Sequence, residues 1–185
     1  DNSFIELVEF HIDSGRKIAL QVENLTVMTP FAEMTRSLME DLSFSLDFGN
    51  SLLIRGHSGV GKSSLLRAIG GLWSDGQGTI HRCSTDECFF MPQHPYMCLG
   101  TLQQQVLYTN IDASTISDSE MFAALEAAQL GYLMKRYRMD DKVDWAHTLS
   151  LGEQQRMGFA RLFLRKGISL AILDESTSAL DEENE

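Results

Sequence analysis

Eight residues, G-H-S-G-V-G-K-S from Gly56 to Ser63, give the strongest indication of fold in this chain. They match the spacing G-x-x-x-x-G-K-[ST], follow the apolar run 51–54 and lead into a helical pattern at 63–69. Glycines let the backbone wrap closely, so successive amides and the start of a helix can face a phosphate group. Because a chance match has a probability under about 1%, we predict a phosphate-binding loop between a strand and a helix.

The last residues of this loop would carry defined chemistry. The ammonium group of Lys62 would reach the β- and γ-phosphates of a nucleotide, and the Ser63 hydroxyl would ligate Mg²⁺. The alternative interpretation is a tight turn before a capped helix. A nucleotide site also needs a carboxylate near the metal, so a second motif is required.

A carboxylate pair follows the apolar run 170–173, which predicts a buried strand. Asp174 and Glu175 stand at its C-terminal end, where open α/β sheets bind ligands. Asp174 would hold the Mg²⁺ shell, and Glu175 would polarise an attacking water. Gln93, which follows a strand predicted at 88–91, would offer its amide oxygen to the metal or the water. Taken alone, these residues are also typical of strands that enter ordinary loops.

The remaining periodicity predicts an α/β fold. Strands are expected at 18–27, 42–48, 51–54, 79–82, 88–91 and 168–173, and 51–54 is apolar enough for a buried central strand. Helical patterns occupy 63–69, 101–138 and 153–165. Residues 1–15 show little periodicity and are expected to be a connector. The helices thus form an insertion between two strand-rich parts.

The composition excludes several classes of protein. Hydrophobic residues make up 43% and charged residues 22% of the chain, as in an ordinary soluble domain. The net charge of -11 argues against nucleic acid as a partner, because a phosphate backbone needs a basic face. No apolar run is long enough for a membrane span. Three cysteines, an odd number, favour a reducing compartment over a disulfide framework.

A second short motif, L-S-L-G-E-Q-Q-R from Leu149 to Arg156, begins the last predicted helix. Ser150 and Glu153 form the S-x-x-E pattern of a capping box, in which each side chain satisfies an amide near the helix start. The start of a helix also suits an anion. The residues alone therefore leave two interpretations, a helix cap and a grip on a phosphate that belongs to another molecule.

The order of these motifs resembles the nucleotide-binding domain of an ABC ATPase. The phosphate loop, Gln93, the L-S-L-G-E motif, the Asp174-Glu175 pair and then S-A-L-D at 178–181 follow one another as in that family. The resemblance covers residues 16–185 and implies ATP and Mg²⁺ as ligands. It also implies a P-loop NTPase fold with a mixed central sheet, an N-terminal antiparallel β-subdomain and a helical subdomain near residues 101–160. The implied ATP-binding residues are Gly56, His57, Ser58, Gly59, Val60, Gly61, Lys62, Ser63 and Ser64.

The same resemblance assigns roles to the other motifs. In the signature, Ser150 and Gly152 would contact the γ-phosphate of ATP bound to a second nucleotide-binding domain. Two ATP molecules would thus be held in a head-to-tail dimer with two-fold symmetry. The full signature is Ser150, Leu151, Gly152 and Glu153, and the D-loop, which would communicate across the interface, is Ser178, Ala179, Leu180 and Asp181. The implied catalytic residues are Glu175, Gln93 and Lys62, and the implied metal ligands are Ser63, Gln93 and Asp174.

Finer features resemble subfamily D half-transporters and bacterial relatives of the SbmA/BacA kind. They are G-G-L-W at 70–73, M-P-Q-H-P-Y-M at 91–97 and the L-S-L-G-E form of the signature. This resemblance implies a domain that powers transport of a fatty-acyl or lipid-like substrate, together with a transmembrane domain, on the cytosolic or stromal face of a membrane. The alternative functions are a soluble ABC ATPase acting on DNA or ribosomes and a degenerate, regulatory ATP-binding site.

Four features depart from the family pattern. Leu151 and Glu153 replace a glycine and a glutamine of the commoner signature, and His57 stands where proline is frequent. The aromatic residue that stacks on adenine is expected near Thr29, with Phe31 only a neighbour. The family places a further strand and a switch histidine after the D-loop, beyond the last residue here. The chain is therefore expected to be a fragment that binds ATP but hydrolyses it poorly when isolated.

Overall fold

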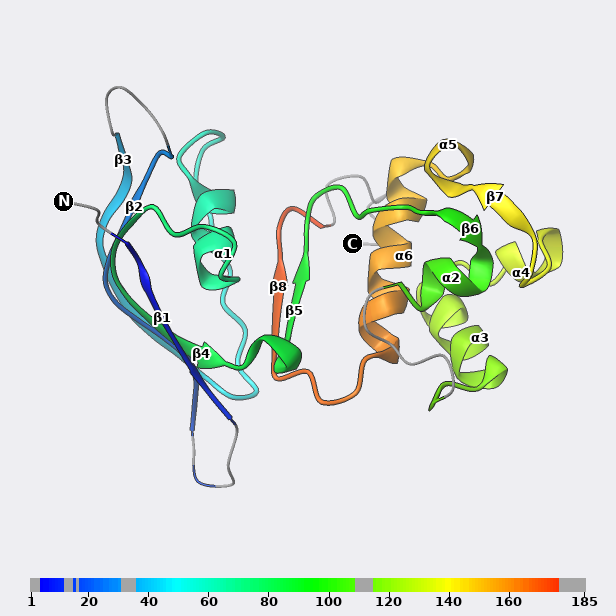
Figure 1. The fold of residues 1–185 in the computed structure, drawn as a ribbon, viewed down its shortest axis with the longest axis horizontal. Helices are drawn as coiled ribbons and strands as arrows, with labels where there is room; N and C mark the ends of the chain where they lie inside the picture. Colours follow the sequence, from blue (N-terminus) through cyan, green and yellow to red (C-terminus); the bar gives the residue numbers. More distant parts are fainter. Residues whose placement is uncertain (1–3, 12–14, 16, 31–35, 109–114, 177–185) are drawn as a thin grey trace. The chain divides into compact units, whose positions relative to one another are not determined.

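A computed structural model describes residues 4–11, 15, 17–30, 36–108 and 115–176 (Figure 1). The chain divides into two compact units. The sheet unit comprises Asp1–Phe90 and Ile168–Ile172, and the helical unit comprises Met91–Gly167 and Leu173–Glu185. Each unit has its own cluster of buried apolar side chains. Each is therefore held together by its own core.

The sheet unit is built on a four-stranded mixed sheet in the order β1-β4-β2-β3 (Figure 1). Its strands are β1 (Glu6–Phe10), β2 (Ile18–Met28), β3 (Ser37–Asp47) and β4 (Gly76–Cys83). β1 runs parallel to β4, whereas β4 and β3 both run antiparallel to β2. Three of these strands are confirmed, but β1 lies where the sequence predicts a connector. Its side chains are exposed or half-buried, so this edge strand leaves only a weak hydrophobic pattern.

Helix α1 (Lys62–Ile69) follows the phosphate loop and packs on the sheet. Leu65, Ala68 and Ile69 are buried in the same core as the apolar side chains of β2. Their spacing of three and four residues gives the helix one apolar stripe. Gly71, just after the helix, has a φ of 75°, a left-handed conformation that commonly ends helices. The helix predicted at 63–69 is confirmed.

The apolar run 51–54 is not a strand, and the sequence prediction was wrong here. Leu52 and Leu53 are 49% and 71% exposed. Within the described residues, the order of the sheet gives this run no neighbouring strand. An apolar segment without such a neighbour gains no ladder hydrogen bonds and has no sheet face to bury. The run is therefore not a strand because it lacks a pairing strand, which its composition does not specify.

Gly78 in β4 is a position where an added methyl group should destabilise the sheet unit. Its φ is 105°, and a Cβ atom would lie 2.5 Å from the carbonyl oxygen of Asn24 and 2.7 Å from the Cα of Leu25. Because left-handed backbone and overpacking are both unfavourable, Gly78→Ala should lower the free energy of unfolding by about 3 kcal/mol. Denaturant-induced unfolding measures this loss.

Gly49→Ala is the matched control for this prediction. Gly49 also has a positive φ, 78°, but a Cβ there would have nothing within 4 Å. Only the backbone term then applies, and we expect a loss of about 1 kcal/mol. Equal losses for the two variants would show that the close approach of β2 to Gly78 contributes nothing.

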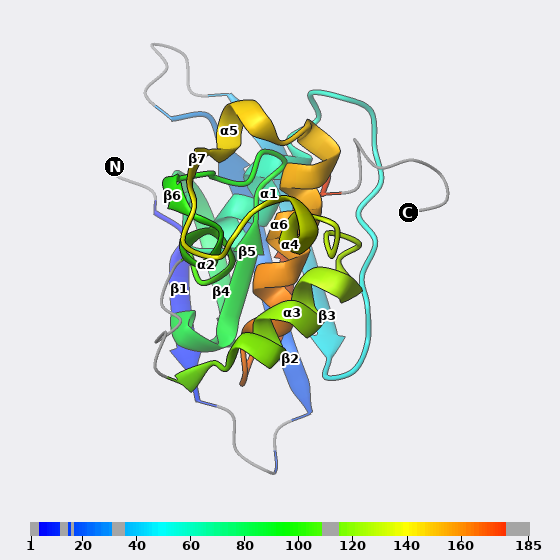
Figure 2. The ribbon, with the colours of Figure 1, turned by 90° about the vertical axis from the view of Figure 1, so that its right-hand side faces the viewer.

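In the helical unit, short helices pack around α6 (Leu151–Leu164). The others are α2 (Leu102–Val106), α3 (Asp118–Ala127), α4 (Leu133–Arg136) and α5 (Trp145–Thr148), and β6 (Leu99–Thr101) pairs antiparallel with β7 (Lys142–Asp144). α3 lies against α6 in both ribbon views (Figures 1 and 2). Trp145 is fully buried and donates its Nε1 hydrogen to the Gly100 carbonyl at 2.8 Å. The helix predicted at 153–165 is confirmed by α6. The helical pattern predicted at 101–138 is confirmed only in the described residues, as the three short helices α2, α3 and α4, and its residues 109–114 lie outside them. None of the helices in the described ranges has the length and apolar character that crossing a bilayer requires.

A separate two-stranded sheet carries the remaining predicted strands, β5 (Cys88–Met91) and β8 (Leu170–Leu173). The amide of Ser169 donates to the Glu87 carbonyl at 2.8 Å, and the amide of Asp174 donates to the Met91 carbonyl at 2.9 Å. The hydrogen-bonded residues follow the same order along both strands, which indicates a parallel pair. β8 corrects one expectation, because its side chains alternate between buried and exposed instead of being buried throughout. Gln93 and Asp174 follow the same ends of the two strands.

Candidate functional site

The phosphate loop in the sheet unit opens onto the N-terminus of α1. Gly59 and Gly61 have φ values of 82° and 96°, in the left-handed region that glycine adopts without strain. Gly61 is the N-cap residue, and its carbonyl accepts the Leu65 amide at 2.9 Å. The first turn of α1 contains no acidic residue, so no carboxylate of that turn competes for its amides. This local structure suits an incoming anion.

Lys62 folds back over its own loop. Its Nζ atom donates to the carbonyl oxygens of Gly56 and His57 at 2.9 and 3.0 Å. These contacts hold the ammonium group against the backbone of the loop, where phosphate oxygens could replace the carbonyls as charge-assisted acceptors. His57 takes part in them through its backbone carbonyl and not through its side chain.

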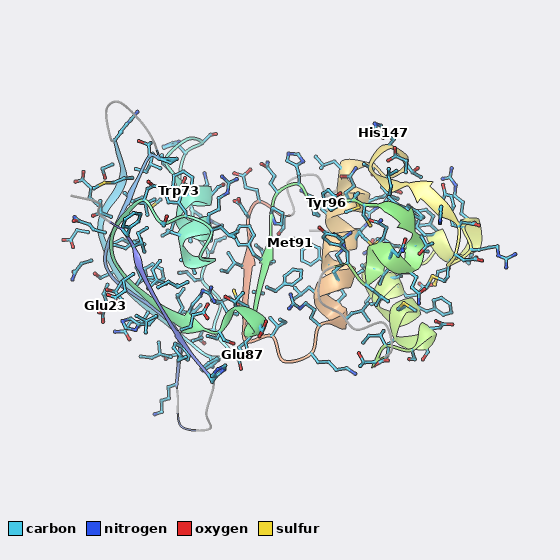
Figure 3. All side chains as sticks on the ribbon, viewed as in Figure 1. Glu23, Trp73, Glu87, Met91, Tyr96 and His147 are labelled. Atoms are coloured by element: carbon cyan, nitrogen blue, oxygen red, sulfur yellow. The ribbon has the colours of Figure 1, made fainter. Side chains whose placement is uncertain are left out.

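Gln93 and Glu175 are brought together in the helical unit, although 82 positions separate them. Gln93 Nε2 donates to Glu175 Oε2 at 2.9 Å. Figure 3 labels Met91 and Tyr96, which bracket the segment that carries Gln93. Asp174 is buried at the end of β8, whereas Glu175 is exposed and has a φ of 46°. A left-handed glutamate is uncommon and usually persists because its surroundings hold it.

A residue that the sequence reasoning missed holds these two segments. Gln155 on α6 is fully buried, and its Nε2 atom lies 3.2 Å from the Gln93 carbonyl and 3.4 Å from the Glu175 carbonyl. A signal was present, because Gly152, Gln155 and Gly158 recur every three residues along the buried face of α6. A glutamine in phase with a buried face needs hydrogen-bond partners there.

The signature turn forms the predicted capping box. Ser150 is the N-cap of α6, its Oγ accepts the Glu153 amide at 3.3 Å, and its own amide donates to Glu153 Oε2 at 2.6 Å. Gly152 is buried, and Leu151 projects outward with 38% of its surface exposed. The capping interpretation is therefore confirmed. It leaves the phosphate interpretation open, because a well-formed helix start is also an anion site.

Tyr132 adds a contact to this turn that the sequence did not predict. Its hydroxyl donates to Glu153 Oε1. Burial, together with the neighbouring Glu153 carboxylate, raises the pKa of Tyr132 to about 12. Burial also acts to raise the pKa of Glu153, but the hydrogen bonds from Tyr132 and Ser150 outweigh it and leave that pKa lowered. Glu153 is therefore held as a carboxylate with both oxygens engaged.

Arg161, on the same helix, joins three parts of the helical unit. Its Nε donates to the Gln105 carbonyl at 2.8 Å, one terminal nitrogen donates to the Tyr96 carbonyl at 2.9 Å, and its guanidinium lies 4.9 Å from the ring centre of Tyr108. Burial lowers the pKa of Arg161 to about 10, so the group stays charged at neutral pH. The side chain thereby fastens α2 and the segment after Gln93 to α6.

The other predicted residues fall in less informative places. The D-loop, Ser178 to Asp181, and Phe31 lie outside the described residues. Thr29 follows β2, and its hydroxyl accepts the Arg36 amide at 3.1 Å. The phosphate loop belongs to the sheet unit, whereas Gln93, the signature and the Asp174-Glu175 pair belong to the helical unit.

A family comparison matches the middle of the chain. Residues 39–178 match the family model described as ABC transporter. An uncharacterized ABC transporter ATP-binding protein of Synechocystis is 47% identical over 173 residues, which is 92% of this chain and 25% of that protein. ABC transporter D family member 1 of Arabidopsis thaliana is 40% identical over 90% of this chain and 13% of its own length.

Further comparisons agree in sequence and in fold. The lysosomal cobalamin transporter of Homo sapiens is 39% identical over 90% of this chain and 29% of its own length. The chain therefore spans less than a third of each of these three relatives. A bacterial Atm1-family ABC exporter, solved with ATP bound, superposes with a TM-score of 0.78 over 96% of this chain and 32% of that one, at 23% identity. This last likeness bears on the fold alone.

Proposed function

The chain belongs to the ABC transporter family, and from that premise we propose that it binds and hydrolyses ATP to power a membrane transporter. The observation that carries the proposal is the loop at 56–63, which folds with left-handed glycines into the N-terminus of α1. Backbone amides in this arrangement bind phosphate without any further device. The hydrogen bond between the amide of Gln93 and the carboxylate of Glu175 supports the proposal that the chain hydrolyses ATP.

In the proposed mechanism, each predicted residue has one task. Lys62 and the loop amides would bind the β- and γ-phosphates, and Ser63, Gln93 and Asp174 would provide oxygen ligands of the kind that Mg²⁺ prefers. The metal, when bound, neutralises charge on the phosphates. The amide nitrogen of Gln93 donates to Glu175, so the amide oxygen of Gln93 remains for the metal or the water. Glu175 accepts the proton of the attacking water.

The proposal extends to a symmetric dimer and to a membrane partner. Ser150 and Gly152 would meet the γ-phosphate held by the partner domain, and the D-loop would lie at that interface. Two of the relatives are described as ABC transporter proteins, and one of these two belongs to the D family. We therefore infer a transmembrane domain as partner and a location on the cytosolic or stromal face of a membrane. The fatty-acyl or lipid-like substrate remains a prediction from subfamily resemblance, whereas one relative of similar identity is named for cobalamin.

Lys62→Met in the full-length protein tests the phosphate-binding assignment. The substitution removes the ammonium group. On ATP binding, this group would exchange its hydrogen bonds to the Gly56 and His57 carbonyls for hydrogen bonds to phosphate oxygens. Hydrogen bonds to charged groups contribute about 1.5–3 kcal/mol each, so ATP affinity should fall by roughly 10- to 100-fold. Titration calorimetry with ATP, with and without Mg²⁺, measures the change.

Lys17→Met is the control for this prediction. Lys17 is exposed in the same unit, and its loss should leave ATP affinity unchanged. If Lys62→Met also leaves it unchanged, the loop does not bind phosphate. If ATP binds with the expected affinity but is not hydrolysed by the full-length protein, the chain is a degenerate, regulatory ATP-binding site and not an ATPase that powers transport.

A further inference from the structure

We propose that Gln155 is a positioning residue that couples the signature turn to Gln93 and Glu175. The inference rests on the proposed function, because it concerns how the two ATP molecules of the proposed dimer influence each other. The signature of one domain faces the ATP of its partner, whereas Glu175 acts on the ATP of its own domain. Gln155 lies on the helix that the signature begins and touches the segment that carries Glu175.

A single amide group, that of Gln155, contacts both backbone segments. Its Nε2 atom carries two hydrogens, and the Gln93 and Glu175 carbonyls lie at 3.2 and 3.4 Å from it. The side chain has no exposed surface. If the amide lost these two hydrogen bonds, it could not form new ones with water. Burying an amide is unfavourable unless it is hydrogen-bonded. The position of α6 therefore constrains both backbone segments.

The two segments that Gln155 contacts are already joined to each other. Gln93 Nε2 donates to Glu175 Oε2 at 2.9 Å, so the two segments are linked through their side chains as well as through the Gln155 amide. Glu175 also has the left-handed φ of 46°. Such a conformation costs about 1–3 kcal/mol and persists only where surrounding contacts offset that cost. The hydrogen bond from Gln155 is one contact that restrains this peptide.

The helix makes the link stiff. Ser150 and Gln155 are five residues apart, which corresponds to about 7.5 Å along one α-helix. Glu153 anchors the first turn through Ser150 and Tyr132. A shift of this turn, when Ser150 meets the partner's phosphate, would therefore move the Gln155 amide with it. We infer that Glu175 reaches its productive position only when the signature is engaged. A contiguous set of hydrogen bonds, and not distance alone, carries this coupling.

Gln155→Met in the full-length protein tests the inference. Methionine keeps the length of the side chain and removes both donors. Because small misplacements of catalytic groups can cost on the order of 100-fold, the turnover number for ATP should fall by roughly 10- to 100-fold. The dissociation constant for ATP should stay within a factor of three, since the phosphate loop lies in the other unit.

Gln105→Met is a matched control in the same unit. Gln105 is also fully buried and donates its amide, to the Cys98 carbonyl at 2.6 Å, and within the described part of the chain no hydrogen bond joins it to Gln93 or Glu175. Its turnover number should fall less than threefold. If both glutamine variants reduce turnover equally, Gln155 has only a structural role in the helix. Gln155→Asn, which keeps the amide but shortens its reach, should reproduce the loss if the methionine variant does not fold.

A double-mutant cycle separates this inference from the proposed function. With Glu175→Gln already present, Gln155→Met should cause no further loss of turnover, because Gln155 acts through Glu175. A further loss equal to that in the wild-type background would overturn the inference. If Glu175→Gln itself leaves hydrolysis unchanged, the assignment of the base fails instead. If Glu175→Gln slows hydrolysis and Gln155→Met does not, the proposed function stands and the coupling is absent.

Discussion

Glu175→Gln in the full-length protein should lower the rate of ATP hydrolysis by about 10²- to 10⁴-fold, the usual range for a general base. The substitution keeps the shape of the side chain and removes its basicity. The glutamine oxygen can still accept the hydrogen bond that Gln93 Nε2 now donates to Glu175 Oε2 at 2.9 Å. The site should therefore keep its structure and retain ATP, so the proposed dimer should accumulate in its ATP-bound form. Single-turnover measurements with radiolabelled ATP distinguish slowed hydrolysis from slowed release.

Glu126→Gln provides the control for this experiment. Glu126 is an exposed carboxylate on α3 of the same unit, and its neutralisation should leave hydrolysis unchanged. ATP affinity should be equal in both variants. Hydrolysis at the wild-type rate in Glu175→Gln would remove Glu175 from the role of base.

Arg161→Met should lower the free energy of unfolding of the chain by about 3 kcal/mol. The methionine fills part of the space, but the Gln105 and Tyr96 carbonyls lose donors at 2.8 and 2.9 Å. Each buried acceptor left without a partner costs about 1–3 kcal/mol. Loss of the contact with the Tyr108 ring adds to this. Denaturant unfolding followed by the fluorescence of Trp145, which is buried in the same unit, measures the change.

Two variants define the cause of that loss. Arg138 is 82% exposed in its side chain and pairs only with exposed Asp140 among the described ion pairs, so Arg138→Met should change stability by less than about 0.5 kcal/mol. Arg161→Lys keeps the charge but lacks the planar fork that reaches separate carbonyls at once. It should recover less than half of the loss. Full recovery would show that charge, and not the fork geometry, matters at this position.

Several features of the candidate site were predictable because their chemistry is local. The glycine spacing at 56–63 predicts a loop whose proposed phosphate contacts come from its own backbone, and the Ser150-Glu153 pair forms its capping box within one helical turn. The apolar runs at 88–91 and 170–173 located two strands, and the residues just after them, Gln93 and Asp174, followed from that. Each of these predictions uses neighbours in the chain.

Other features could not be predicted because they depend on residues far apart in sequence. The run 51–54 has the composition of a buried strand, yet Leu53 is 71% exposed, because burial requires a partner strand that composition does not specify. β1 was missed for the opposite reason: pairing with β4 makes a strand from residues with little periodicity. Tyr132 and Gln155 were missed because their partners, Glu153, Gln93 and Glu175, are brought to them only by packing.

The sequence by itself determined the family, the phosphate loop and the order of motifs, because spacing within one loop or one turn is enough to define them. Only the tertiary structure decided which distant groups meet. It joined Gln93 to Glu175, placed Gln155 beneath both carbonyls and fastened Arg161 to the segment after Gln93. The physical reason is that a buried polar group must find its hydrogen-bond partners in the folded chain, and those partners are chosen by packing, not by position in the sequence.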